Sequence, residues 1–204
     1  MESGCARSGW LGADRIFTLP ELQRRFDDVE ISVFTPKFTM VPANFFRPEA
    51  AREILSQTVT LAENDQVSYV ELPQFGAVAI FSVQDNGPIA RVLHEMVLRT
   101  DGSKGRLLPE QYLLLEAIDS ITDYNKIVVS YADGCLYLVV AQGRTLLLCN
   151  SYEASDFTTA EYFIFMVMKK FQLNPEVSTI FFRTPVSRDD EVSLYNYFRS
   201  VEFI

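Results

Sequence analysis

The sequence predicts an α/β fold, and three observations indicate it. From Ile127 onward, strand-like and helix-like segments follow in the order strand, strand, strand, helix, strand, helix. Two turn dipeptides, Asp133-Gly134 and Gln142-Gly143, separate the first three strands. The helix predicted over Ser155–Leu173 has almost no polar face, so it needs cover from a sheet and from another layer. This order is typical of an RNase H-like subdomain, a mixed sheet flanked by helices.

The composition fits a globular chain with a large core and an acidic surface. Of 204 residues, 48% are apolar, including 16 Phe and 9 Tyr. The formal net charge of −9 repels phosphate backbones, so we expect no nucleic-acid partner. Met1–Leu11 lacks the apolar region of a signal peptide. The apolar block Tyr162–Met168 is far shorter than the roughly 20 residues of a membrane span. We therefore expect no membrane insertion and a cytoplasmic location.

The three cysteines predict neither a disulfide framework nor a metal site. Cys5, Cys135 and Cys149 are odd in number and follow no metal-binding spacing. We expect Cys135 and Cys149 to be small core residues in a reducing compartment.

The N-terminal half predicts alternating short elements after a frayed segment at 1–17. Proline near a helix start and period-two alternation in strands are the signals. Helices are expected at Leu19–Phe26, Pro48–Ser56 and 88–99, and extended segments at Val29–Phe34, Phe38–Val41, Val67–Leu72 and Ala77–Val83.

A polar linker with two glycines, Thr100–Arg106, predicts the boundary between two subdomains. We place the N-terminal subdomain at 18–104 and the C-terminal subdomain at 105–204.

The C-terminal half predicts a helix at Pro109–Ile121 and strands at Ile127–Tyr131, Leu136–Ala141 and Thr145–Cys149. With two-residue loops, Ile127 shares a face with Leu136 and Cys149, whereas Cys135 lies on the opposite face and cannot bridge to Cys149. The second face, with Ser130 and Tyr137, is then the wetter one.

Helix-capping signals mark the last elements. Thr158 and Glu161 have the spacing of a capping box at the start of the helix over Ser155–Leu173. A strand is expected at Thr179–Arg183. Ser187 is expected to cap the last helix, and Val201–Ile204 returns to extended character.

Three segments resemble one bacterial family, the domain of unknown function 3822. They are Phe38–Pro42 followed by Phe45-Phe46, Leu146–Tyr152 (LLLCNSY), and Ser155–Phe165. The similarity runs over residues 18–204. It implies an actin-like ATPase fold, with two RNase H-like subdomains side by side and no established activity. Members usually begin with a strand hairpin. Here only an unpatterned tail precedes Leu19–Phe26, so we expect the N-terminal subdomain to be incomplete.

The resemblance also locates a candidate nucleotide contact. Actin-like ATPases hold phosphates in two glycine-rich hairpins, with a carboxylate organising Mg²⁺. The first hairpin would fall in the missing segment, and the second at Asp133-Gly134. With one Asp and one Gly, this site is better interpreted as an ordinary turn than as a phosphate cradle.

Other chemistries find little support in the sequence. His94 is the single histidine, so no multi-histidine metal site can form, and we interpret it as a helix-flank residue. The three strands predicted between Ile127 and Cys149 contain no Asp or Glu, whereas a two-metal nuclease needs several carboxylates. The acidic run Asp189–Glu191 is interpreted as a helix start. We expect no catalytic residues and no metal site.

Two functions from different classes follow. The first is a non-catalytic interaction or adaptor module, which binds a protein partner segment between its subdomains or associates with itself. Aromatic residues near element ends favour it: Phe45, Phe46, Phe75, Tyr195, Tyr197 and Phe198. The alternative is an actin-like protein that binds ATP and Mg²⁺ with weak ATPase activity, contacting nucleotide through Asp133 and Gly134. Because the phosphate hairpins are poor, we favour the first function and lean against an enzyme.

Overall fold

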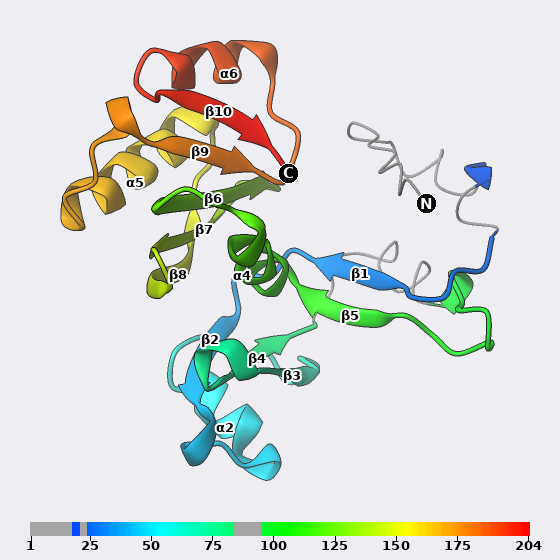
Figure 1. The fold of residues 1–204 in the computed structure, drawn as a ribbon. Coiled ribbons are helices and arrows are strands. Elements are labelled where there is room, and N and C mark those ends of the chain that lie inside the picture. The colour runs from blue at the N-terminus through cyan, green and yellow to red at the C-terminus, as the bar shows by residue number, and fades with distance from the viewer. Residues whose placement is uncertain (1–17, 21–23, 84–94) are drawn as a thin grey trace. The chain divides into compact units, whose positions relative to one another are not determined.

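The computed structural model describes residues 18–20, 24–83 and 95–204 (Figure 1). Contacts divide the chain into two compact units. The first comprises Met1–Ile31 and Gly87–Arg106, and the second comprises Ser32–Asn86 and Leu107–Ile204. The subdomains at 18–104 and 105–204, and the frayed segment at 1–17, stay predictions.

Short backbone pairings connect the described residues of the first unit. Phe26 pairs with Arg99 and Leu98 with Lys104, so these residues are not helical. Of the helix predicted at 88–99, residues 88–94 lie outside the described residues. Within the helix predicted at Leu19–Phe26, residues 21–23 also lie outside them. Strands β1 (Glu30–Val33) and β5 (Arg106–Pro109) pair and continue into the second unit.

A three-stranded antiparallel sheet confirms the predicted extended segments of the N-terminal half. Its order is β2-β4-β3, formed by β2 (Phe38–Pro42), β3 (Val67–Leu72) and β4 (Ala77–Ser82). The 3₁₀ turn η3 (Pro48–Ala50) leads into α2 (Ala51–Ser56), which covers this sheet with Leu55 fully buried.

A five-stranded mixed sheet forms the centre of the second unit. It comprises β6 (Asn125–Ala132), β7 (Cys135–Gln142), β8 (Thr145–Glu153), β9 (Thr179–Phe182) and β10 (Ser200–Phe203), in the order β10-β9-β6-β7-β8. Strands β6, β7 and β8 are antiparallel, whereas β9 is parallel to both β6 and β10. This sheet confirms the predicted order of C-terminal elements.

Helices cover both faces of this sheet (Figure 1). On one face, α5 (Phe157–Lys170) and α6 (Arg188–Tyr195) pack against Leu138 and its neighbours. On the other face, α4 (Glu110–Ser120) packs against Tyr137, which is 1% exposed. The prediction that this second face is the wetter one was therefore wrong, because α4 covers it.

The register of β8 differs from the prediction. The loop between β7 and β8 is Gly143-Arg144, with Gly143 at φ 55°, and a bulge falls between Val140 and Ala141. This shift pairs Cys149 with Val139 and places it on the face of Cys135, not on the opposite face as predicted. Both thiols are nevertheless free, as predicted, because Cys135 pairs four residues farther along with Glu153.

Polar side chains define where α5 and α6 begin. The Asp156 carboxylate accepts a 2.7 Å bond from the Thr159 amide, so Asp156 caps α5, not the predicted Thr158. Ser187 caps α6, as predicted. Among the described residues, no helix combines the length and the apolar character needed to cross a bilayer.

A buried carboxylate attaches α4 to its neighbours. Glu110 is completely buried, and its carboxylate accepts bonds from Ser130 of β6 at 2.6 Å, from Arg183 at 2.9 and 3.0 Å, and from Ser32 of β1. A buried charge is tolerated when it is paired and fully hydrogen-bonded. These bonds fix the first turn of α4 against the C-terminal ends of β6 and β9.

The central strand makes a direct test of this core possible. Leu138 is fully buried on β7, so Leu138→Ala should lower the free energy of unfolding by about 2–5 kcal/mol in urea denaturation. Val192→Ala, at a side chain 56% exposed on α6, should change it by less than about 0.5 kcal/mol. Equal effects of the two substitutions would contradict the described packing.

Candidate functional site

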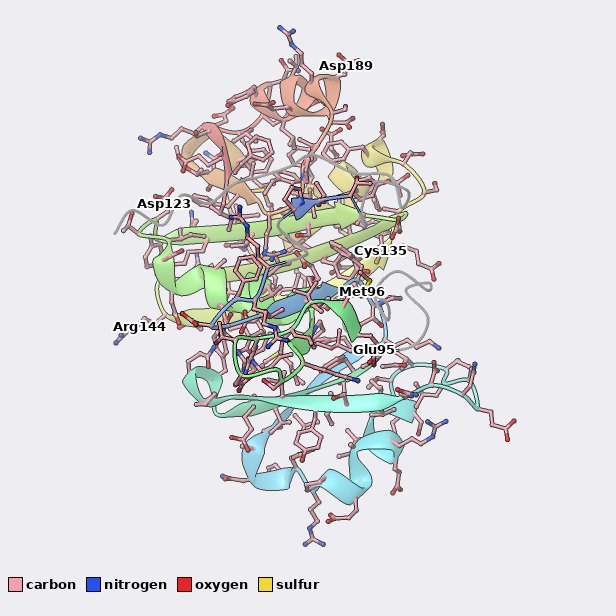
Figure 2. The ribbon with its side chains drawn as sticks, turned by 90° about the vertical axis from the view of Figure 1, so that its right-hand side faces the viewer. Glu95, Met96, Asp123, Cys135, Arg144 and Asp189 are labelled. Carbon is pink, nitrogen blue, oxygen red and sulfur yellow. The ribbon has the colours of Figure 1, made fainter. Side chains whose placement is uncertain are left out.

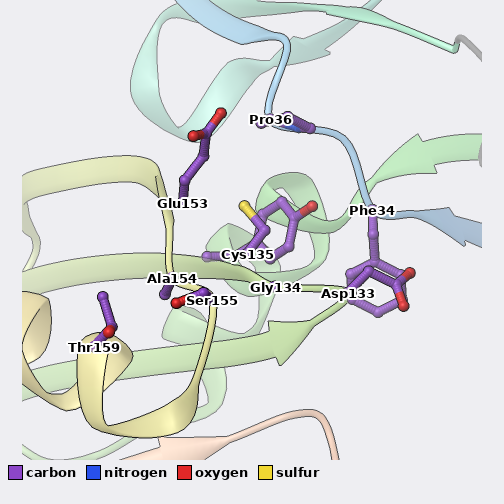
Figure 3. A pocket seen from close by; sticks show the side chains of 10 residues that line it. Phe34, Pro36, Asp133, Gly134, Cys135, Glu153, Ala154, Ser155 and Thr159 are labelled. Atoms are coloured by element: carbon purple, nitrogen blue, oxygen red, sulfur yellow. The ribbon is translucent and has the colours of Figure 1, made fainter.

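The predicted candidate residues form a tight turn beside a cavity. Asp133 and Gly134 connect β6 to β7 with φ values of 51° and 70°, a conformation that favours glycine at the second position. The Gly134 carbonyl accepts a 2.8 Å bond from the Ala154 amide. The cavity is about 610 Å³ in volume, and Figure 3 shows its lining: Phe34, Pro36, Asp133, Gly134, Cys135, Tyr137, Glu153, Ala154, Ser155 and Thr159.

This turn cavity, as we name it, is acidic. Asp133 and Glu153 are exposed, and neither has a hydrogen-bond or ion-pair partner among the described residues. The nearby N-terminus of α5 already binds the Asp156 carboxylate. No Lys or Arg appears among the described lining residues. A phosphate group entering the turn cavity would therefore face carboxylates without a compensating cation.

The described residues contain no metal-binding cluster whose ion would offset this negative charge. Within the described ranges, no group of three or more His, Cys, Asp or Glu side chains could hold a metal ion. His94 and Cys5 lie outside those ranges.

The thiols near the cavity are not activated. Burial, followed by the charge of Glu153, raises the pKa of the Cys135 thiol above its ordinary value. Burial raises the pKa of Cys149 to about 12. Burial also raises the pKa of the neighbouring Tyr137 phenol, which forms a 5.6 Å ring contact with Phe34. Because the thiolate is the nucleophilic form, neither cysteine is suited to covalent catalysis near neutral pH.

A second cavity, about 760 Å³ in volume, continues from the first. Its walls come from β2, from the segment after α2, and from β8: Pro36, Lys37, Phe38, Thr39, Met40, Thr58, Val59, Thr60, Cys149, Asn150, Ser151 and Glu153. Pro36 and Glu153 line both cavities, so the two are adjacent. We name the combined depression the β2–β8 groove.

Two sheet edges border the β2–β8 groove. Strand β8 ends the five-stranded sheet and β2 ends the three-stranded sheet, so among the described strands each pairs on one side alone. Alternate N–H and C=O groups of such a strand point away from its partner and remain available for pairing. One bond crosses between the walls, from the Ser151 hydroxyl to the Pro36 carbonyl at 3.4 Å.

The cation of the groove is already neutralised. Lys37 pairs with the buried Asp65 at 2.6 Å, and the same carboxylate accepts a bond from the Ala62 amide. Burial opposes ionisation of Asp65, but these bonds outweigh it and lower the pKa of the carboxyl from 3.8. The described part of the groove therefore presents negative charge without a neighbouring cation at its Asp133 and Glu153 end.

Glu153 was not among the predicted site residues, because the strand predicted at Thr145–Cys149 ended four residues before it. Strand β8 continues to Glu153. The β-branched and aromatic residues favoured in strands include tyrosine, so Tyr152 was the signal in the sequence for a longer strand. Figure 3 shows Glu153 and Cys135 extending from adjacent strands toward the segment that carries Pro36. Figure 2 places Cys135 and Arg144 at opposite ends of the sheet, so Arg144 lies away from this acidic end.

The six aromatic residues near element ends differ in exposure. Phe45 is 80% exposed, and Tyr195 and Tyr197 are about half exposed at 50% and 51%. Phe198 is 4% exposed and belongs to the core, so it offers no contact area to a partner. Phe46 and Phe75 are half-buried.

Comparison with known proteins gives a family and a fold. The family model described as Protein of unknown function (DUF3822) matches residues 14–201. A Bacteroides thetaiotaomicron protein of actin-like ATPase fold and unknown function is similar at 20% identity and a TM-score of 0.68, over 94% of this chain and 74% of that chain. No match was found among curated proteins.

A second solved structure is described as the PilM-PilN type IV pilus biogenesis complex. It is similar at 15% identity and a TM-score of 0.53, over all of this chain (100%) and 79% of the other. These likenesses show that the chain has the predicted actin-like ATPase fold.

The Lys37–Asp65 pair gives a pH-dependent prediction. A carboxyl whose pKa is lower in the folded state stabilises the fold above its unfolded pKa, and this stabilisation disappears as the pH falls through the folded pKa. Asp65→Asn should lower the free energy of unfolding by about 1–3 kcal/mol near neutral pH. The difference from wild type should narrow as the pH falls below 3.8.

Asp119→Asn is the matched control, because Asp119 is exposed and has no partner among the described residues. Urea denaturation across this pH range measures both variants. A constant gap between wild type and Asp65→Asn would show that the carboxylate charge does not stabilise the fold.

Proposed function

Because the chain belongs to the family Protein of unknown function (DUF3822), we propose its function from its own geometry: a non-catalytic interaction module that holds an extended partner segment. The observation that carries the proposal is the β2–β8 groove with its two strand edges. Edge strands recruit extended peptides by main-chain hydrogen bonding, and side-chain pockets then supply specificity.

The lining of the groove suits a peptide. Phe38, Met40 and Val59 provide apolar contact, and Thr39, Thr60 and Asn150 provide hydrogen-bonding groups. Such a mixture of apolar contact area and neutral polar groups is typical of protein interfaces. From the sequence we expected a partner to bind between the two predicted subdomains. The walls of the groove come from both of them, because β2 lies within 18–104 and β8 within 105–204.

The chemistry of the described residues supports binding more than catalysis. Among the described residues, no histidine lines the turn cavity and no side-chain group could hold a metal ion, and burial raises the pKa of both described thiols. Free thiols also favour a reducing, cytoplasmic location, which is part of the proposal. A structure of the same fold, the PilM-PilN complex, contains a bound partner protein, so partner binding is compatible with this architecture.

The second candidate is ATP binding with weak hydrolysis, which the actin-like ATPase fold and the position of Asp133 and Gly134 in the turn cavity favour. The acidic lining argues against it. We expect millimolar Mg·ATP to leave the thermal unfolding midpoint unchanged. Saturation at 100 times Kd would instead add about 2.7 kcal/mol of stability. A dose-dependent rise that Asp133→Asn alters would favour the nucleotide function.

Selection from a random peptide library tests the interaction function. We expect the wild-type protein to enrich peptides from the library. The variants Thr60→Trp and Asn150→Trp should bind these peptides at least about tenfold more weakly than the wild type does, because a large ring at an exposed groove position excludes the peptide. Asn196→Trp, at an exposed residue after α6, is the matched control and should bind like wild type.

Circular dichroism and thermal midpoints establish that the three tryptophan variants are folded. Recovery of no peptide, or of peptides that all three variants bind equally, would refute a binding function for the β2–β8 groove.

A further inference from the structure

We propose that the occupant of the β2–β8 groove is a basic, extended segment of a partner protein that pairs with β8 as an added strand, its Lys or Arg side chains lying against Asp133 and Glu153. This inference rests on the proposed binding function and specifies the class of partner. One juxtaposition carries it: β8 has no strand partner on one edge among the described strands, and this edge ends beside two carboxylates that have no ion-pair partner within the described ranges.

Strand β8 has nine residues, longer than a typical strand of about 5–6 residues. Five residues that line the two cavities lie in β8 or directly after it: Cys149, Asn150, Ser151, Glu153 and Ala154. An added strand therefore has a backbone partner along the length of the groove, not at a single point.

The acidic end of the β2–β8 groove favours a basic occupant. Glu153 lines both cavities, and Asp133 lines the turn cavity at the end of β6. Both carboxylates are exposed and unpaired among the described residues, and Asp156 adds a third carboxylate at the start of α5. The one described cation of the lining, Lys37, pairs with Asp65. Because the chain also carries a net charge of −9, the field at the groove attracts a basic segment and repels an acidic one.

The same charge argues against a second copy of this chain as the occupant. A copy brings the same net negative charge to the acidic end of the groove. Like charges brought together disfavour association, whereas a Lys- or Arg-bearing strand neutralises both carboxylates.

The test uses synthetic peptides of nine residues, the length of β8, in which Lys alternates with Thr. Fluorescence anisotropy measures their affinity for the full chain, against a peptide with Glu in place of every Lys. We expect the Lys peptide to bind and the Glu peptide not to bind. Asp133→Asn and Glu153→Gln should each weaken the Lys peptide about two- to fivefold.

Asp189→Asn is the matched control, because it removes an equivalent exposed carboxylate on α6 and should leave affinity unchanged. Figure 2 shows Asp189 at the top of the view, whereas Cys135 lies at the level of the central strands. Equal weakening by all three variants would mean that binding follows net charge alone, and would overturn the assignment of the basic side chains to Asp133 and Glu153.

Backbone methylation tests strand addition. Two further Lys peptides carry N-methyl groups on odd or on even residues. An added strand uses the N–H groups of alternate residues, so one methylated peptide should lose binding and the other should keep it. Equal binding by both would overturn strand addition.

The outcome of the random selection separates this inference from the proposed function. Groove-dependent peptides that are acidic or neutral would leave the binding function standing and refute the basic occupant. Self-association that Asn150→Trp abolishes, measured by sedimentation, would identify a second copy as the occupant and equally refute it. Absence of any groove-dependent peptide would refute the binding function itself.

Discussion

The position of β8 as the last strand of the five-stranded sheet is the constraint on which the groove depends. Strand β8 pairs with β7 alone among the described strands, and a bulge at Val140 sets its register. That register places Cys149 and Glu153 on the face of Tyr137, so the free edge and the acidic end belong to one surface. In most proteins an exposed edge risks unwanted pairing, and charged side chains beside it restrict which partners can add. In the proposed binding mode, Asp133 and Glu153 have that role.

The buried carboxylate of Glu110 maintains the scaffold behind this surface. It receives bonds from Ser130 and Arg183, which belong to β6 and to the end of β9. Helix α4 is thereby fixed on the same face of the sheet that carries Tyr137 and Cys135. Phe34 contacts Tyr137, so the segment that leads from β1 to β2 packs on this face and brings Pro36 to the groove. Removing the Glu110 carboxylate would leave the buried Ser130 hydroxyl and the Arg183 guanidinium without this partner, which is costly at a buried position.

Local patterns in the sequence predicted the element order of the C-terminal half, the β6–β7 register and the Ser187 cap. Each depends on residues close in the chain: the Asp133-Gly134 turn, alternating apolar positions, and a serine before an acidic first turn. What could not be predicted depends on distant residues. The bulge that moves Cys149 to the other face, the cover of Tyr137 by α4, and the burial of Glu110 all arise from packing between segments. For the site, the sequence supplied Asp133 and Gly134, but Glu153 lay beyond the predicted end of the strand. The groove itself lies between β2 and β8, which are more than a hundred residues apart in the chain. The Pro36 carbonyl, for example, accepts a bond from the Ser151 hydroxyl 115 positions away, and no local pattern encodes such a contact.

The central claim is that the free edge of β8 receives an extended partner. Amide hydrogen exchange of the full chain, with and without a groove-selected peptide, tests this most directly, because exchange reports the loss of free N–H groups residue by residue. The account predicts that alternate amides within Thr145–Glu153 gain protection when the peptide is bound. Protection confined to α5 and α6, with unchanged exchange throughout β8, would contradict it.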